Sequence, residues 1–303
     1  MSVSDETRRI GGHEIELSNL DKVFFPDPGI TKGDLIAYYD QVADHLLRYA
    51  AGRIVTMQRY PDGVEGKSFY QKEVPDYFPH WIRTVKVEKE NGSLRQAVLE
   101  DRATLVYLAN QGCIPLHIWP SLADRRMHPD RLIFDLDPSD DDVTGVRLGA
   151  RTLRDVLEEV DLVPFLMTSG SRGFHVVVPL NQEWDFDRVR DFASLIATIA
   201  AEREPDRLTV ETRKKRRKGR VFIDVLRNAY AQHSVAPYAV RALPEAPIAT
   251  PLEWDELDDV EPRTFTIQTL PERLGRRKDP WAGIGRHARS LEGSMGAAQE
   301  GRA

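Results

Sequence analysis

From residue 131 onward, short apolar runs alternate with amphipathic helical patterns, and this order limits the chain to a few folds. Residues 131–137 and 174–180 are apolar runs of strand type, the second rich in valine. Residues 146–160 and 189–199 carry apolar side chains at helical spacing. Strands that alternate with helices favour a sheet with helices on one face. We therefore expect an RNA-recognition-like sheet with helices, in an α+β (mixed α/β) chain.

The first 130 residues have a different organisation. Thr31 predicts a helix N-cap, and apolar side chains follow at helical spacing as far as Tyr49. Residues 53–60, and shorter runs up to residue 99, alternate as strands do. These patterns predict an N-terminal mixed α/β module over residues 1–130, a core over residues 131–284, and a flexible Gly- and Ala-rich tail over residues 285–303.

The composition excludes several classes of protein. Of the 303 residues, 41% are hydrophobic, which is enough to build a core and excludes a disordered or fibrous chain. No apolar run is long enough to cross a membrane, and residues 1–9 lack the apolar stretch of a secretory signal. The single cysteine, Cys113, excludes an intramolecular disulfide and a cysteine-based zinc site. We expect a cytoplasmic protein without a membrane partner.

The net charge of −6 hides an uneven distribution. From Arg213 to Arg220, every residue except Gly219 is basic. Phosphate groups respond to the local potential rather than to the total charge, so an acidic chain can carry a basic track for nucleic acid. We expect this run to form the tip of a hairpin between strands at 208–211 and 221–226. There it either contacts nucleic acid or is only solvated.

Three aspartates lie in predicted strands. Asp135 and Asp137 project from the same face of one strand, about 7 Å apart at Cα. Asp224 lies among apolar neighbours in another strand, where an unpaired carboxylate is costly to bury. Three such carboxylates can hold two Mg²⁺ or Mn²⁺ ions for phosphoryl transfer. The alternatives are a strand end that continues into the acidic residues 140–142, and an ion pair between Asp224 and Arg227.

A Gly- and Ser-rich segment separates two predicted strands. From Thr168 to His175 it reads Thr-Ser-Gly-Ser-Arg-Gly-Phe-His. The glycines allow backbone N–H groups to point at an anion, and the serines, Arg172 and His175 add further donors. The spacing is not that of a P-loop, and a plain turn with a solvated arginine is the alternative. His117, two residues before Trp119, can equally belong to a buried aromatic pair.

Four motifs, taken together and in order, resemble one known family. They are Phe-Asp-Leu-Asp-Pro (134–138), Ser-Gly-Ser-Arg-Gly-Phe-His (169–175), Phe-Ile-Asp-Val-Leu-Arg-Asn (222–228) and Val-Ala-Pro-Tyr-Ala-Val-Arg-Ala (235–242). They resemble the polymerase domain of bacterial ATP-dependent DNA ligase D, a member of the archaeo-eukaryotic primase superfamily. Shorter matches at 21–26, 31–35, 69–72 and 249–254 extend the resemblance over residues 15–281.

The resemblance implies roles for particular residues. Three match the family's catalytic, metal-binding carboxylates: Asp135, Asp137 and Asp224. Six match its contacts with the incoming nucleotide: His117, Ser169, Arg172, His175, Arg227 and Arg241. Four match its DNA contacts, a lysine pair for the 5′-phosphate beyond a gap and two aromatics for a template base: Lys22, Lys32, Phe69 and Tyr70. There are two departures, because Arg172 stands where many relatives have lysine, and Gln58 where a DNA-contacting lysine can occur.

The resemblance also implies a function. It implies a template-directed DNA/RNA nucleotidyltransferase that fills short gaps or extends ends in double-strand break repair by non-homologous end joining. The implied cofactors are two divalent ions, Mn²⁺ or Mg²⁺. The implied partners are a nucleoside or deoxynucleoside triphosphate, DNA with a 5′-phosphorylated gap or end, the end-binding protein Ku and a separate DNA ligase, at a nucleoid-associated location.

Three alternatives to this function stay open. The chain could be a primase that starts chains de novo, or a non-catalytic DNA-end-binding scaffold. A metal-dependent phosphatase or nuclease would explain the aspartates but not the serine loop.

Overall fold

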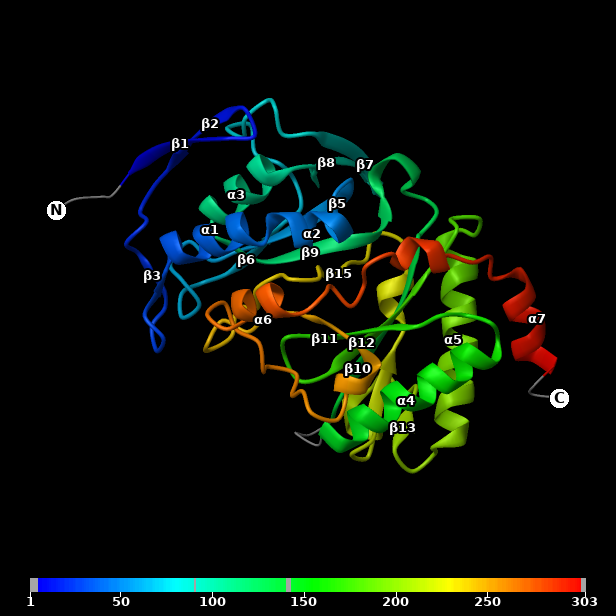
Figure 1. Cartoon of the computed structure of the whole chain (residues 1–303). Helices are drawn as coiled ribbons and strands as arrows, with labels where there is room; N and C mark the ends of the chain where they lie inside the picture. The colour runs from blue at the N-terminus through cyan, green and yellow to red at the C-terminus, as the bar shows by residue number, and fades with distance from the viewer. Residues whose placement is uncertain (1–4, 90, 140–142, 301–303) are drawn as a thin grey trace. The chain divides into compact units, whose positions relative to one another are not determined.

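The computed structural model describes residues 5–89, 91–139 and 143–300, and the chain forms two compact units (Figure 1). Unit 1 comprises Met1–Trp119, Val235–Ala249 and Phe265–Arg277, and unit 2 comprises Pro120–Ser234, Thr250–Thr264 and Lys278–Ala303. This division differs from the predicted boundaries at 130 and 284, because two later segments return to unit 1. The acidic residues 140–142 and the last three residues of the predicted tail lie outside the described residues. No helix in the described ranges has both the length and the apolar character that a membrane crossing requires.

Unit 1 is built on a sheet with the strand order β15-β9-β5-β8-β7, and β6 also pairs with β5. Late residues join this sheet through main-chain bonds, such as that from Ala236 N to Leu116 O. The strands of the unit are β1 (Glu6–Ile10), β2 (His13–Leu17), β3 (Val23–Phe25), β4 (Ile30–Thr31), β5 (Arg53–Arg59), β6 (Phe69–Gln71), β7 (Thr84–Lys89) and β8 (Gly92–Leu99), with most of β9 (Cys113–Leu122) and the second residue of β15 (Ser234–Val235). Its helices are α1 (Lys32–Gln41), α2 (Ala43–Ala50), α3 (Arg102–Asn110) and α6 (Leu270–Arg276).

The predicted N-cap of α1 is confirmed. Thr31 Oγ1 accepts a hydrogen bond from Asp34 N, and the Asp34 carboxylate accepts one from Thr31 N, which forms a capping box. The single helix expected as far as Tyr49 is instead two helices, which meet at Val42. Arg102 donates to the Asp40 carbonyl in the last turn of α1. Apolar spacing continues across this junction, so periodicity alone does not reveal it.

Unit 2 has a sheet with the strand order β13-β14-β10-β12-β11-β16, and helices α4 and α5 pack against it and against each other. The mixed α/β class is therefore confirmed. The strands are β10 (Arg131–Asp137), β11 (Phe165–Thr168), β12 (Phe174–Pro179), β13 (Leu208–Thr209), β14 (Val221–Asp224) and β16 (Pro251–Leu252). The helices are α4 (Val143–Glu159), α5 (Phe186–Arg203) and α7 (Glu292–Glu300).

The prediction of a hairpin around the basic run, residues 213–220, is wrong. Strands β13 and β14 pair in parallel, with Leu208 opposite Val221 and Thr209 opposite Phe222. Parallel strands need a connection that crosses back along the sheet, rather than a tight turn. Residues 210–220 form that connection, and the basic run lies in it.

The end of the chain also differs from the expected flexible tail. Residues 292–300 form α7, whose Ser294 donates a hydrogen bond to the Val160 carbonyl after α4. Glu292 accepts from the Trp184 indole and pairs with Arg188. The small side chains of Ser294 and Ala298, one turn apart, are buried, and their size permits close packing of a Gly- and Ala-rich helix.

Asn228 completes the hydrogen bonding of β10 beyond the end of its pairing with β14. Its Oδ1 accepts from Ile133 N at 2.8 Å, and its Nδ2 donates to Ile133 O at 2.7 Å and to Val225 O at 2.9 Å. The residue is fully buried. This side chain therefore acts as one more strand partner for β10.

We expect Asn228→Ala to lower the free energy of unfolding by about 2–4 kcal/mol, because the buried N–H and C=O groups of Ile133 and the part-buried carbonyl of Val225 lose their partner. Urea denaturation measures this change. Asn181→Ala, at an exposed asparagine of the same unit, is the control and should change stability by less than about 0.5 kcal/mol. Equal effects of the two substitutions would contradict the role of Asn228.

Candidate functional site

The three predicted carboxylates lie on one face of the unit 2 sheet. Asp135 and Asp137 are two residues apart in β10, and Asp224, the last residue of β14, pairs directly opposite Asp135. Side chains that lie opposite each other in an antiparallel pair share a face, so Asp224 joins the aspartates of β10. A Cβ at Gly149 of α4 would lie 3.3 Å from the Leu136 side chain. The carboxylates therefore project from the face of β10 that is opposite to α4.

Burial and mutual repulsion act on this trio. The side chains of Asp135 and Asp224 are 19% and 14% exposed, and that of Asp137 is 41% exposed. Burial raises the pKa of Asp224, and the charges of Asp135 and Asp137 raise it further. The N–H of Leu226, which donates to Asp224 Oδ1, lowers it. A divalent cation would relieve this crowding, since carboxylate oxygens are the hard ligands that Mg²⁺ and Mn²⁺ prefer.

Two arginines bind the Asp137 carboxylate. Arg172 Nη2 lies 3.1 Å from one carboxylate oxygen, and Arg217 Nη1 lies 3.0 Å from the other. Among the described residues, no group of three or more acidic, histidine or cysteine side chains is already arranged to hold a metal ion. The site is thus a cluster of compensated charges, in which arginines and carboxylates alternate.

Arg217 is a site residue that the sequence analysis missed. It is buried, whereas residues 213–216 and Lys218 of the same basic run are exposed. Its guanidinium lies 4.1 Å from the centroid of the Phe222 ring and donates to the backbone carbonyls of Glu211 and Thr212. A run of seven basic residues, broken once by Gly219, indicates a basic segment, but the run does not show which side chain turns inward.

Asp135 has a histidine on one side and an arginine on another. His175 of β12 pairs opposite Asp135 in the sheet, and its Nε2 lies 3.3 Å from Asp135 Oδ1. Arg227 Nε lies 3.5 Å from Asp135 Oδ2, and its Nη2 lies 3.9 Å from Asp224 Oδ2. The ion pair between Asp224 and Arg227 that the sequence left open is therefore present, within the larger cluster.

The Ser-Gly-Ser loop leads into the same cluster. Ser169 Oγ accepts hydrogen bonds from Ser171 N and Gly173 N, both at 3.2 Å. These two N–H groups are therefore satisfied within the loop, contrary to the expectation that the loop amides point at an anion. The hydroxyl proton of Ser169 can still be donated. Arg263 Nε holds the loop from outside through a 2.9 Å bond to Ser171 O.

Gly173 brings the loop against β10. A Cβ at this position would overlap with the carbonyl oxygen of Leu136, so only glycine fits. The close approach places Arg172, the preceding residue in the chain, within reach of Asp137.

The predicted lysine pair lies in unit 1. Lys32 N donates to the Lys22 carbonyl at 2.8 Å, which places the two residues side by side. Lys32 Nζ donates to Ser18 O at 2.5 Å, and Lys22 Nζ lies 2.6 Å from Asp62 Oδ1. Burial, followed by the charge of Lys22, lowers the pKa of Lys32 to about 8. The two ammonium groups thus lie close enough to repel each other.

The remaining predicted residues also lie in unit 1, so the predicted nucleotide contacts are divided between the units. The rings of Tyr70 and His117 are 6.4 Å apart. Burial raises the pKa of Tyr60, and Tyr70 and Arg241 also act on it, so both side chains lie within electrostatic reach of Tyr60. Phe69 and Tyr70 of β6 are 46% and 59% exposed.

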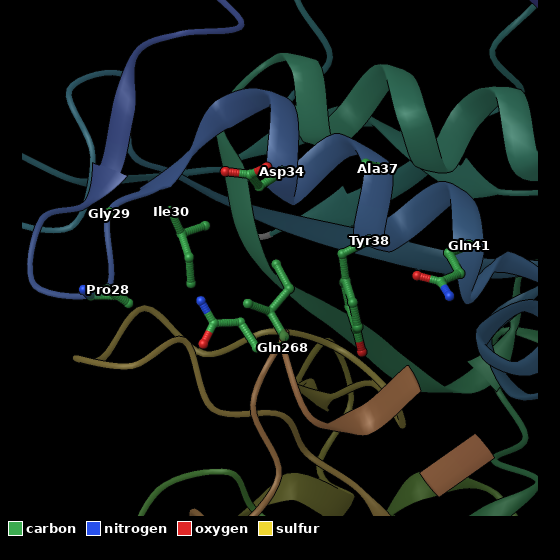
Figure 2. A pocket seen from close by; sticks show the side chains of 9 residues that line it. Pro28, Gly29, Ile30, Asp34, Ala37, Tyr38, Gln41 and Gln268 are labelled. Atoms are coloured by element: carbon green, nitrogen blue, oxygen red, sulfur yellow. The ribbon is translucent and has the colours of Figure 1, made fainter. Parts of the chain in front are cut away.

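A pocket of about 340 Å³ in unit 1 contains none of the predicted site residues. Tyr38 and Gln41 of α1 and Gln268 line it, together with the turn before α1 (Figure 2). The Tyr38 hydroxyl is already bonded to the Tyr238 carbonyl, and Asp34 serves in the helix cap. The candidate chemistry therefore belongs to the charged clusters rather than to this pocket.

Comparisons with known proteins agree on one family. A family model described as "LigD, primase-polymerase domain" matches residues 31–281. The multifunctional non-homologous end joining DNA repair protein LigD of Mycobacterium tuberculosis (strain H37Rv) is 31% identical over 278 aligned residues, and the match covers 88% of this chain and 36% of that protein. The bifunctional non-homologous end joining protein LigD of Bacillus subtilis is 31% identical over 271 residues, 88% of this chain and 44% of that protein. The chain thus spans less than half the length of these relatives.

A solved structure has the same fold. The polymerase domain from Mycobacterium tuberculosis ligase D, in complex with DNA, matches with a TM-score of 0.84 and 29% sequence identity. The match covers 91% of this chain and 99% of that one. The likeness therefore extends over the whole of that domain.

We expect Gly173→Ala to lower the free energy of unfolding by about 1–3 kcal/mol, because the added methyl group pushes the loop away from the Leu136 carbonyl. Thermal denaturation measures the change. Gly275→Ala is the matched control, since a Cβ there meets nothing within 4 Å and lies in a helix that alanine favours. A Gly173→Ala protein as stable as the control would show that the loop does not need this close approach.

Proposed function

The chain belongs to the LigD primase-polymerase domain family, and on this premise we propose that it is a template-directed nucleotidyltransferase that fills short gaps or extends ends in double-strand break repair. The proposal depends on one observation. The register of β10 with β14 pairs Asp135 with Asp224, and both side chains lie on the same face of the sheet as Asp137. Carboxylates in this arrangement are suited to holding two metal ions for phosphoryl transfer.

Asp135, Asp137 and Asp224 would hold two divalent ions, Mn²⁺ or Mg²⁺. When bound, such ions activate an attacking hydroxyl and stabilise the charge of the leaving pyrophosphate. The chemistry of the donor set fits them, because carboxylate oxygens are preferred ligands and a cation would offset the repulsion that Asp135 and Asp137 exert on Asp224.

The basic side chains of the cluster bind the triphosphate. Arg172 and Arg227 already compensate the carboxylates, so each can give a charge-assisted hydrogen bond to a phosphate oxygen. Ser169 donates its remaining hydroxyl proton, and His175 donates from Nε2 when it is protonated there. His117 and Arg241 keep their predicted role as nucleotide contacts.

Unit 1 binds DNA beyond the gap. The polymerase domain of Mycobacterium tuberculosis ligase D was solved in complex with DNA, which supports DNA as the partner of this chain. Lys22 and Lys32 bind the 5′-phosphate, whose charge of nearly −2 offsets the repulsion between the ammonium groups. Phe69 and Tyr70 offer exposed rings on which a template base can stack. Ku and a separate DNA ligase are the proposed protein partners.

The direct test is incubation of the protein with a primed, 5′-phosphorylated gap, Mn²⁺ and one nucleotide at a time. The proposal expects incorporation of the nucleotide that the template specifies. A primase would extend an unprimed template as well, and a scaffold would bind the gap without extending the primer.

Asp137→Ala should reduce extension by about 10³-fold or more, because a shared ligand for both ions is lost. Single-turnover kinetics measure the rate, and a binding titration should show unchanged affinity for DNA. Asp258→Ala is the control, because Asp258 is an exposed acid that pairs with Arg151 on the surface of unit 2. A loss of less than tenfold for Asp137→Ala would remove this residue from the catalytic role.

Preference for a 5′-phosphorylated gap should fade as the pH rises from 7 to 9.5. Lys32, whose pKa is lowered to about 8, loses its proton in this range, whereas a lysine with an ordinary pKa keeps it. The measurement is the ratio of affinities for gaps with and without the phosphate. The gap with a hydroxyl end serves as the internal control, and a ratio constant up to pH 9.5 would contradict the assignment of Lys32.

A further inference from the structure

The exposed aromatic residues of the described chain are concentrated in one short segment. Phe69, Tyr70 and Tyr77 are 46%, 59% and 60% exposed, and no other large aromatic residue among those described is exposed to this extent. Large apolar side chains usually gain free energy from burial, so a concentration of exposed rings marks an interaction surface. Phe69 and Tyr70 already have a proposed partner in DNA, but Tyr77 does not.

Arg59 connects Tyr77 to Phe69. It lies opposite Phe69 in the pairing of β5 with β6, and its guanidinium is 5.6 Å from the centroid of the Phe69 ring. Its Nη1 donates to the Tyr77 hydroxyl at 2.7 Å and to Gln71 Oε1 at 2.8 Å. Its Nε and Nη2 donate to the backbone and side-chain oxygens of Gln111 at 2.8 and 3.1 Å. A side chain with this many fixed bonds is a rigid support.

The Tyr77 ring is held at its other end as well. It packs edge-on against Phe78, with ring centroids 5.3 Å apart. Phe78 is buried and packs against Tyr107 at 5.0 Å. Because both the hydroxyl and the ring edge are fixed, Tyr77 loses little conformational entropy when a ligand stacks on it.

The charge around Tyr77 favours a nucleic acid over an apolar protein partner. Within the described residues, each hydrogen-bond acceptor of Arg59 is neutral, so its positive charge is not cancelled. That charge also contributes to the lowered pKa of Lys32, so this surface is within electrostatic reach of the lysine pair. Asp76, next to Tyr77, is paired with Arg95 at 3.4 Å.

We propose that Tyr77, positioned by Arg59, is a further stacking site for an unpaired base of DNA, in addition to Phe69 and Tyr70. The inference rests on the proposed function, because it extends the DNA contact of unit 1. A flat, amphipathic ring beside a fixed cation suits any of the four bases, since each base has a π face. The site therefore favours gaps in which a second template nucleotide is unpaired, whatever its sequence.

The test uses the full chain and DNA gaps of one, two and three nucleotides with a downstream 5′-phosphate. One unpaired template base is replaced by 2-aminopurine, whose fluorescence falls when it stacks on an aromatic ring. We expect stronger quenching for the two-nucleotide gap than for the one-nucleotide gap. We also expect roughly 5- to 100-fold tighter binding, which is the gain in affinity that one base–aromatic stack provides.

Three variants of Tyr77 separate the ring from its hydroxyl. Tyr77→Ala and Tyr77→Leu should lose the additional quenching in the two-nucleotide gap and the preference for that gap, whereas Tyr77→Phe should keep most of both. Tyr77→Leu also covers the case in which Tyr77→Ala fails to fold, because it keeps apolar bulk without a π face. Met127→Ala, at an exposed apolar residue of unit 2, is the control and should behave as the native protein does.

Arg59 is tested as a positioning residue. Arg59→Lys keeps the positive charge but cannot make the forked bonds to Tyr77 and both oxygens of Gln111. We expect it to weaken quenching while leaving the preference for a phosphorylated end unchanged. A purely electrostatic role would be satisfied by lysine, and full quenching in Arg59→Lys would contradict the positioning role.

The failure of this inference differs from that of the proposed function. If Tyr77→Ala and Tyr77→Leu quench the probe and prefer the longer gap as the native protein does, Tyr77 does not stack on DNA. The inference is then overturned. The proposed function in gap filling is not affected by this outcome. If the native protein binds none of the gaps, the proposed function fails as well.

Discussion

Repulsion among three carboxylates on one sheet face is the constraint on which the unit 2 site depends. The register that places Asp224 opposite Asp135 crowds like charges at a half-buried position, which costs folding free energy. The surrounding side chains are arranged to offset that cost. Arg172 and Arg217 bind Asp137, while His175 and Arg227 lie beside Asp135. Groups that compensate carboxylates in this way are also placed to bind phosphate, and so stability and chemistry depend on the same contacts.

The rest of unit 2 fixes the geometry of that face. Leu132, Phe134 and Leu136 are fully buried, and this prevents β10 from shifting its register by one residue, which would turn the aspartates into the core. Asn228 holds β10 beyond the end of β14, and the lack of a side chain at Gly173 lets the serine loop approach it. The strand that carries the site is thus held by buried core side chains, by the Asn228 amide and by the close approach at Gly173.

Sequence reasoning predicted the features that depend on local spacing. The period of two in β10 placed Asp135 and Asp137 together, and Thr31 marked the start of α1. It failed where distant segments decide the outcome. The parallel pairing of β13 with β14 and the return of residues 235–249 to unit 1 follow from tertiary contacts, which no local pattern records. Arg217 and Arg59 were missed for the same reason, because burial of one arginine depends on which acceptors surround it.

The central claim is that Asp135, Asp137 and Asp224 act as one site for two metal ions. Electron paramagnetic resonance of the protein with Mn²⁺ and a non-hydrolysable nucleoside triphosphate tests it most directly, because two ions at about 3.5–4 Å are magnetically coupled. The account predicts a coupled Mn²⁺ pair in the native protein and its loss in Asp224→Asn, with the fold retained. A native protein that binds only isolated ions, or a coupled pair that survives in Asp224→Asn, would contradict it.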